Sequence, residues 1–165
     1  MKKVLLIGCG NPLRADDGIG PHAVRRMAAT STLATLAGLT PHQLTPDLAE
    51  PIQAARRVIF IDASIQDPPG TIRIRPLVAA TTPPRVLAHW LSPSSLLGLT
   101  NQLYGICPPA VLVSMGARSF GFGEPFSPEV AHAFPALITC LERLVAPQTP
   151  SSESTRLWDA RPGSA

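Results

Sequence analysis

The chain has 165 residues, of which 45% are hydrophobic and 15% are charged, and its formal net charge is +3. This length and composition suit one globular domain with a core of its own, and they exclude a disordered chain. The sequence has neither a clustered basic stripe nor an apolar stretch of about 18 residues, so we expect no nucleic-acid binding and no membrane span.

The first third of the chain predicts two strands and two helices. Residues Val4–Ile7 form a continuous apolar run, which is typical of a strand buried on both faces of a sheet. A helix is predicted to begin at Asp16 or Asp17, either of which can cap it, and to end near Ala29. A weak strand is predicted near Gln43 and Leu44, followed by a short helix over residues 47–56.

Three further strands are predicted in the middle of the chain. Val58–Ile61 and Ala110–Val113 are continuous apolar runs, as expected for the central strands of a covered parallel sheet. Thr71–Arg75 alternates between apolar and basic side chains instead, and this pattern favours an edge strand with one face in water.

Two more helices have clear start signals. Ser92 followed by Pro93 predicts an N-cap and a proline in the first turn, and Gly105 is a natural stop for that helix. Ser127 and Pro128 repeat the signal, and apolar residues at helical spacing continue to Val145. Pro135 lies inside this last helix and predicts a kink or a break.

The predicted order is therefore β-α-β-α-β-β-α-β-α. It favours a three-layer α/β/α sandwich around a mostly parallel, twisted sheet of about five strands, with one edge strand of opposite direction. We expect residues 1–146 to form this single domain. Residues 147–165 are rich in proline and polar side chains, and we expect them to form a flexible C-terminal tail.

The candidate catalytic or metal-binding residues are sought directly after the strands, because ligands of open parallel sheets bind beyond the carboxyl ends of the strands. Asp17 follows the first strand, Asp62 follows the run at Val58–Ile61, and His89 precedes the helix that begins at Pro93. Two carboxylates and one imidazole that meet at this edge would suit a divalent transition metal with an open position for substrate or water.

Simpler roles remain open for the same residues. An N-cap is the favoured interpretation of Asp16, while Asp17 could also be a cap or an acid favoured by the helix dipole. Asp62 could accept hydrogen bonds from backbone amides of a neighbouring loop. Packing or surface roles are expected for the other histidines, which are His22, His42 and His132.

The pair Gly8-x-Gly10 invites a comparison with dinucleotide-binding loops. Leu13 stands where the third glycine of that motif would be. Asp16 and Asp17 would also repel a pyrophosphate at the helix N-terminus. We therefore expect the two glycines to permit a tight turn, and together with Asn11 to shape the backbone beneath the site.

Three motifs resemble those of the hydrogenase maturation proteases. The stretch from Val4 to Gly20, which includes LIGCGNPLRADDGIG, resembles the N-terminal signature of that family. VIFIDAS at residues 58–64 resembles the family's strand that ends in aspartate. The third motif is His89-Trp90-Leu91, which precedes the predicted helix ending at Gly105. The resemblance covers roughly residues 2–145.

This resemblance implies a cytoplasmic endopeptidase, of aspartyl or metal-dependent type, that removes the C-terminal extension of a [NiFe]-hydrogenase large-subunit precursor. It implies that Asp17, Asp62 and His89 are the catalytic and metal-contacting residues. The implied metal is nickel carried by the precursor, and these ligand types are also compatible with another divalent ion. The segment from Gly116 to Phe126 departs from the better-known members, in a loop expected to face the substrate.

Two alternatives remain. The first is a non-catalytic chaperone that docks on the same precursor, and the second is a nucleotide-binding α/β module.

The cysteines, Cys9, Cys107 and Cys140, are widely spaced and odd in number, so we expect free thiols and a cytoplasmic protein.

Overall fold

The computed structural model describes residues 3–30, 35–81, 91–147 and 158. Five strands form one sheet, in the order β2-β1-β3-β5-β4. The strands are β1 (Val4–Gly8), β2 (Leu36–Leu39), β3 (Arg57–Ser64), β4 (Ile72–Leu77) and β5 (Ala110–Gly116). All neighbouring strands are parallel except β4, which pairs with β5 in the antiparallel direction. The predicted sandwich with one reversed edge strand is confirmed.

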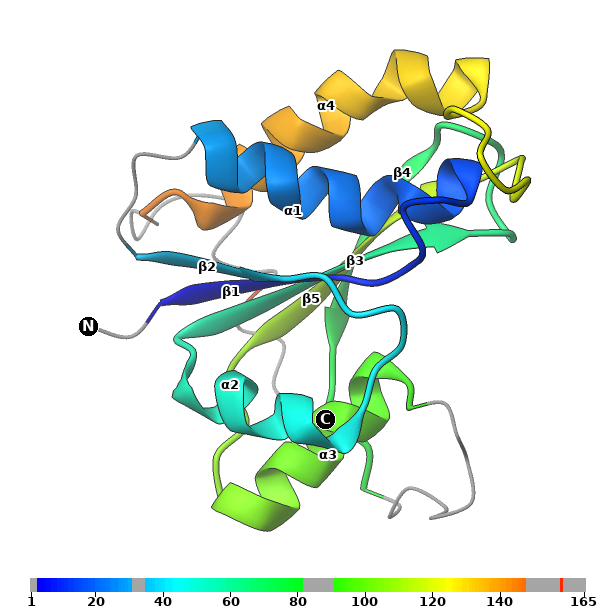
Figure 1. Ribbon diagram of the computed structural model, residues 1–165. Coiled ribbons are helices and arrows are strands. Elements are labelled where there is room, and N and C mark those ends of the chain that lie inside the picture. The colour runs from blue at the N-terminus through cyan, green and yellow to red at the C-terminus, as the bar shows by residue number, and fades with distance from the viewer. Residues whose placement is uncertain (1–2, 31–34, 82–90, 148–157, 159–165) are drawn as a thin grey trace, which may run out of the picture.

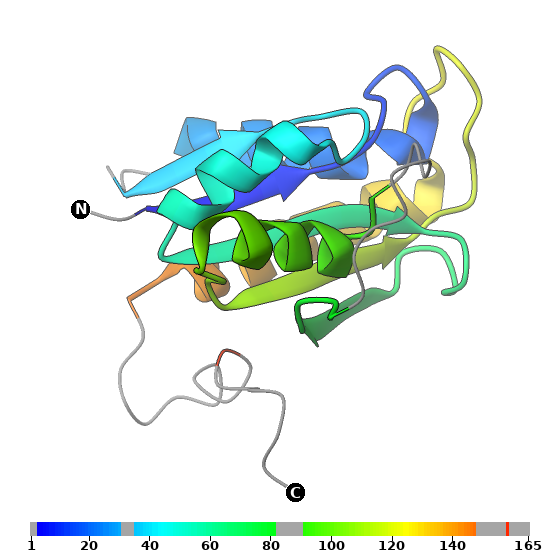
Figure 2. The same ribbon diagram turned by 90° about the horizontal axis from the view of Figure 1, so that it is seen from below.

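Helices cover both faces of the sheet. They are α1 (Ile19–Thr30), α2 (Ala49–Ala54), α3 (Pro93–Tyr104) and α4 (Pro128–Val145), with short 3-10 turns η1 (Ala15–Gly18) and η2 (Pro46–Leu48). Figure 1 shows α1 and α4 on one face and α2 and α3 on the other. Figure 2 shows α2 and α3 side by side across the second face.

The alternation of side chains along β3 explains why its run is apolar throughout. Ile59 and Ile61 belong to the core beneath α1 and α4, whereas Val58 and Phe60 belong to the core beneath α2 and α3. Each of the four is at most 1% exposed. Successive residues of a strand point to opposite faces, so a strand covered on both sides must be apolar at every position.

The helix signals near residue 92 act as predicted. The Ser92 hydroxyl accepts a hydrogen bond from the amide of Ser95 at 3.1 Å, and Pro93 occupies the first turn. Gly105 ends α3 in the left-handed region with φ of 66°. In α4 the helix continues through Pro135, so the predicted break does not occur. Pro135 is exposed, and water can therefore reach the backbone carbonyl that loses its partner.

The strand predicted near Gln43 and Leu44 is wrong, because the edge strand is β2, at Leu36–Leu39. Alanine and glycine inside this segment weaken its strand pattern. Packing explains why position 38 is a glycine, because a Cβ there would lie 2.5 Å from a methyl carbon of Val24 on α1. A small residue in β2 lets α1 pack closely.

The expected division at residue 146 stays a prediction, because residues 148–157 and 159–165 lie outside the described residues. Trp158 is 8% exposed, packs against the α1–α4 core and lies 5.0 Å from the guanidinium carbon of Arg57. In the described part of the chain, no helix combines the length and apolar character that a membrane span requires.

Candidate active site

The connection between β1 and α1 carries the acidic pair, and a tight turn at Gly10 shapes it. Gly10 has φ of +126°, and a Cβ there would lie 1.9 Å from the carbonyl oxygen of Asp17. A side chain would clash with backbone as well as strain the turn, so only glycine fits. The backbone of Asp17 therefore lies directly against the turn that follows β1.

A second close approach holds the start of α1 over two strands. A Cβ on Gly20 would lie 2.5 Å from the carbonyl oxygen of Cys9 and 2.7 Å from that of Ile61. The Cys9 amide donates to the same Ile61 oxygen at 3.0 Å, which extends the pairing of β1 with β3. The glycine spacing thus places the acidic turn at the carboxyl ends of β1 and β3.

Asp17 presents a half-buried carboxylate that is held by its own loop. One of its oxygens accepts the amide of Asn11 at 2.9 Å, while the Asn11 side-chain oxygen accepts the amide of Leu13 at 2.9 Å. No lysine, arginine or histidine within residues 3–30, 35–81 and 91–147 forms an ion pair with Asp17. Within those ranges, the Asn11 amide is the hydrogen-bond donor that orients its carboxylate.

Asp62 lies near the end of β3 and has a raised pKa. Burial is the main cause, and the negative charge of Asp17 raises the pKa further. The amide of Ala63, which donates to Asp62 at 2.9 Å, opposes these effects. The result is a pKa of about 6. Asp17 follows β1 and Asp62 lies near the end of β3, and these strands pair in parallel, so both acids belong to the same rim of the sheet.

Cys9 lies between the strand end and these acids. Burial, followed by the charges of Asp62 and Asp17, raises the pKa of the Cys9 thiol to about 12. A thiol with that pKa stays protonated at neutral pH and is a poor nucleophile. Hydrolytic chemistry at this rim would therefore depend on the carboxylates rather than on sulfur.

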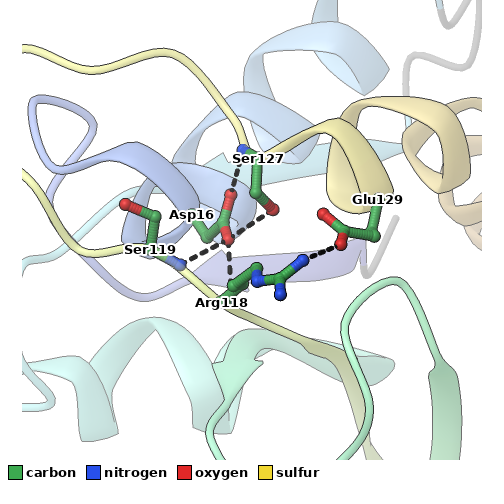
Figure 3. Close-up of polar contacts among 5 residues, drawn as sticks. All are labelled: Asp16, Arg118, Ser119, Ser127 and Glu129. Carbon is green, nitrogen blue, oxygen red and sulfur yellow. Dashed lines mark hydrogen bonds and ion pairs between the residues drawn. The ribbon is translucent and has the colours of Figure 1, made fainter.

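Asp16 is completely buried, and its side chain points toward Arg118, Ser119 and Ser127 (Figure 3). Its carboxylate accepts the amides of Arg118 at 2.8 Å, Ser119 at 2.9 Å and Ser127 at 2.7 Å, and also the Ser127 hydroxyl at 2.8 Å. Burial alone would raise the pKa of Asp16, but these four hydrogen bonds outweigh it and hold the pKa below its usual value.

The prediction that Asp16 caps a helix is therefore wrong. Arg14 is the N-cap of η1 and makes no side-chain capping bond. Ser127 is the N-cap residue of α4 as expected, but its hydroxyl binds Asp16 instead of an amide of α4. Local sequence predicts local caps, and this pair of residues is separated by 111 positions. Nothing in the local pattern could reveal such a contact.

Further bonds tie down the loop between β5 and α4. The amide of Asp16 donates to the carbonyl of Ser119 at 3.0 Å, and the Ser119 hydroxyl donates to Glu124 at 2.9 Å. Arg118 forms an ion pair with Glu129 in the first turn of α4 (Figure 3). No local sequence pattern predicts these contacts, which together fix the loop against the acidic turn.

The structure describes two of the three predicted site residues. Asp17 and Asp62 belong to the same rim of the sheet, whereas His89 lies outside the described residues. Over the part of the chain that is described, no three His, Cys, Asp or Glu side chains are close enough to hold a metal ion. Asp17 and Asp62 fit part of a divalent ligand set, because a cation would relieve the repulsion between them.

No protein-family model matches this sequence, and no curated protein does. Solved structures do match. The hydrogenase 2 maturation peptidase from Thaumarchaeota archaeon SCGC_AB-539-E09 is 25% identical with a TM-score of 0.64, and the match covers 86% of this chain and 97% of that one. The hydrogenase maturating endopeptidase HybD from E. coli is 20% identical with a TM-score of 0.67, over 84% and 89% of the two chains.

A third solved structure has a similar fold. The [NiFe] hydrogenase maturation protease HycI from Thermococcus kodakarensis KOD1 is 20% identical with a TM-score of 0.64, and the match covers 86% of this chain and 91% of that chain. The chain thus has the α/β fold of the hydrogenase maturation proteases. The predicted resemblance to these proteases is confirmed by this likeness of fold.

Proposed function

We propose that this chain is an endopeptidase that removes the C-terminal extension of a nickel-loaded [NiFe]-hydrogenase large-subunit precursor. What supports the proposal is the position of Asp17 and Asp62 at the carboxyl ends of two neighbouring parallel strands, in a fold shared with hydrogenase maturation peptidases. That similarity supports a peptidase, and the carboxylate pair supplies chemistry that suits one. The cytoplasm, where free thiols persist, suits the three unbridged cysteines.

Asp62 suits proton transfer to and from water. A carboxyl with a pKa of about 6 is only weakly acidic, so it can accept a proton from water and return it near neutral pH. Asp17 keeps its orientation through the Asn11 amide and raises the proton affinity of Asp62. In the metal-free protein Asp62 is thus the group that can accept a proton, and contact with a cation would convert it to a bound carboxylate.

Nickel enters this proposal as part of the substrate. The carboxylates of Asp17 and Asp62, together with the imidazole of His89, would contact the ion already installed in the precursor. Such contacts would let the peptidase distinguish loaded from empty precursor, because a cation relieves the repulsion between the two acids. When present, the ion can also polarise a carbonyl or lower the pKa of water.

The decisive experiment measures the mass of a nickel-loaded large-subunit precursor before and after incubation with the purified protein. We expect loss of a C-terminal peptide with the wild type and no loss with Asp17→Asn, Asp62→Asn or His89→Ala. Asp47→Asn is a matched control, because Asp47 is an exposed acid on η2 and should not affect processing. Processing by all three variants would refute the proposal.

The same assay separates the enzyme from a chaperone. A chaperone would bind the precursor in a pull-down and leave its mass unchanged with the wild type. The raised pKa of Asp62 favours the enzyme, because docking alone needs no buried carboxyl with a shifted pKa.

A further inference from the structure

A groove of about 450 Å³ opens beside the acidic turn, on the face of the sheet covered by α1 and α4. Pro12 from the turn and His22, Arg25 and Arg26 from α1 line one side of it. Residues 124–126 and Phe134 of α4 line the other. The groove therefore lies between the Asp17 loop and the β5–α4 loop.

Aromatic contacts and the buried Asp16 hold this groove in shape. The His22 ring meets the Phe126 ring edge-on with centroids 5.3 Å apart, and Phe126 lies 5.2 Å from Phe134. Ser127, the next residue, gives both its amide and its hydroxyl to Asp16. The two sides are thus joined beneath the groove, and a preformed groove loses little conformational freedom when it binds a ligand.

The charge of the groove indicates what it would bind. Arg25 and Arg26 are exposed, and within the described ranges neither forms an ion pair. Glu124 also lines the groove and accepts the Ser119 hydroxyl, so two guanidinium groups and one carboxylate leave the groove a net positive charge. Two guanidinium groups beside an aromatic surface suit carboxylates flanked by bulky apolar side chains.

A second groove of about 400 Å³ continues the first along α4. The two share Arg26 and Phe134, and the second is lined in addition by Pro135, Ile138 and Glu142, among others. This continuity makes the combined surface longer than one side chain needs. It suits an extended segment of several residues.

We propose that the combined groove binds an acidic, extended segment of the precursor, with carboxylates at Arg25 and Arg26 and a bulky apolar side chain at Phe126 and Phe134. This rests on the proposed function for the identity of the partner. Because Pro12 lines the groove and belongs to the acidic turn, a segment held there lies beside the Asp17 loop.

Binding is tested without catalysis, by fluorescence anisotropy of a short labelled peptide that carries two adjacent aspartates beside two leucines. We expect saturable binding that Arg25→Ala/Arg26→Ala weakens by about two- to twenty-fold, the range for two solvent-exposed charge contacts. Arg25→Lys/Arg26→Lys should retain most of the affinity. So should Arg75→Ala, which removes an exposed arginine from the edge strand β4.

Two changes to the peptide complete this test. Replacing its aspartates by asparagines should weaken binding to the wild type, and so should replacing its leucines by serines. Equal affinity for the aspartate and asparagine peptides, unchanged binding by Arg25→Ala/Arg26→Ala, or no saturable binding at all would overturn the proposal.

Processing kinetics then separate the groove from the reaction. With nickel-loaded precursor, Arg25→Ala/Arg26→Ala should raise KM and leave kcat near the wild-type value, which is the signature of lost uniform binding. Asp62→Asn should abolish turnover and still bind the acidic peptide. Peptide binding by a wild type that never cleaves precursor would refute the peptidase alone, whereas cleavage with an unchanged KM in the arginine variant would refute the groove alone.

Discussion

The carboxylate of Asp16 binds the backbone amide of Ser127 at 2.7 Å and its hydroxyl at 2.8 Å, although the two residues are 111 positions apart. The adjacent residue, Asp17, takes the opposite role, since its half-buried carboxylate faces the rim near Asp62. Asp16 therefore ties the acidic turn to the start of α4, whereas the carboxylate of Asp17 bonds only within its own loop.

Replacing Asp16 should destabilise the protein strongly. Asp16→Ala leaves three backbone amides and one hydroxyl without their acceptor, and we expect a loss of about 3–5 kcal/mol in the free energy of unfolding. Ser127→Ala removes only the hydroxyl, for which we expect a loss of about 1.5–3 kcal/mol. Urea unfolding measures both, with Asp47→Ala as an exposed control. Near-wild-type stability of Asp16→Ala would mean that these hydrogen bonds are not formed.

The pH dependence of stability should reveal the same carboxylate. The folded pKa of Asp16 is lower than its unfolded pKa, so the unfolded chain binds the extra proton. The stabilisation is therefore complete above the unfolded pKa, which is about 4, and is lost as the pH falls through the folded value. Unfolding of the wild type and of Asp16→Asn, followed from pH 7 to pH 2, should converge at the acid end. Parallel curves would contradict this role.

Asp62 should act on stability in the opposite direction. Its pKa rises from an ordinary 3.8 to about 6, so the folded chain binds more protons between these values, and stability falls as the pH rises through this window. In metal-free protein, Asp62→Asn should therefore be more stable than the wild type at pH 8 by about 1–3 kcal/mol, and equal to it near pH 3. A variant that is less stable than the wild type at pH 8 would contradict the raised pKa.

The turn beneath the site should not tolerate a side chain at Gly10. Gly10→Ala forces a methyl group to within 1.9 Å of the Asp17 carbonyl oxygen, in addition to the strain of φ at +126°. Gly105→Ala is a control with backbone strain alone, because nothing lies within 4 Å of its Cβ position, and it should cost about 1 kcal/mol. Thermal unfolding should show a clearly larger loss for Gly10→Ala. Equal losses would mean that the close approach is absent.

The sequence predicted most of the fold because buried strands and capped helices have strong local patterns. Val58–Ile61 lies within β3, and Ser92 and Gly105 bound α3 as expected. The edge strand β2 escaped prediction, because its Ala37 and Gly38 serve close packing and not strand propensity.

For the site, the sequence predicted which loops carry the acidic residues, but it did not predict the contacts of their side chains. Two acids that follow neighbouring parallel strands must share an edge of the sheet, so the sequence predicted that Asp17 and Asp62 lie at the same edge. Which acid of the pair turns inward depends on Ser119 and Ser127, more than 100 positions away. Such long-range hydrogen bonds have no local signal, so the burial of Asp16 could only be seen in the structure.

The central claim is that Asp17 and Asp62 act on one shared ligand at the rim of the sheet. Anomalous diffraction from a crystal soaked in nickel or cadmium salt tests it most directly. We expect one strong peak between the two carboxylates, with the ring of His89 beside it, and no such peak in Asp17→Asn/Asp62→Asn crystals. Side chains that point apart, or a peak bound by other residues with none at the rim, would contradict the claim.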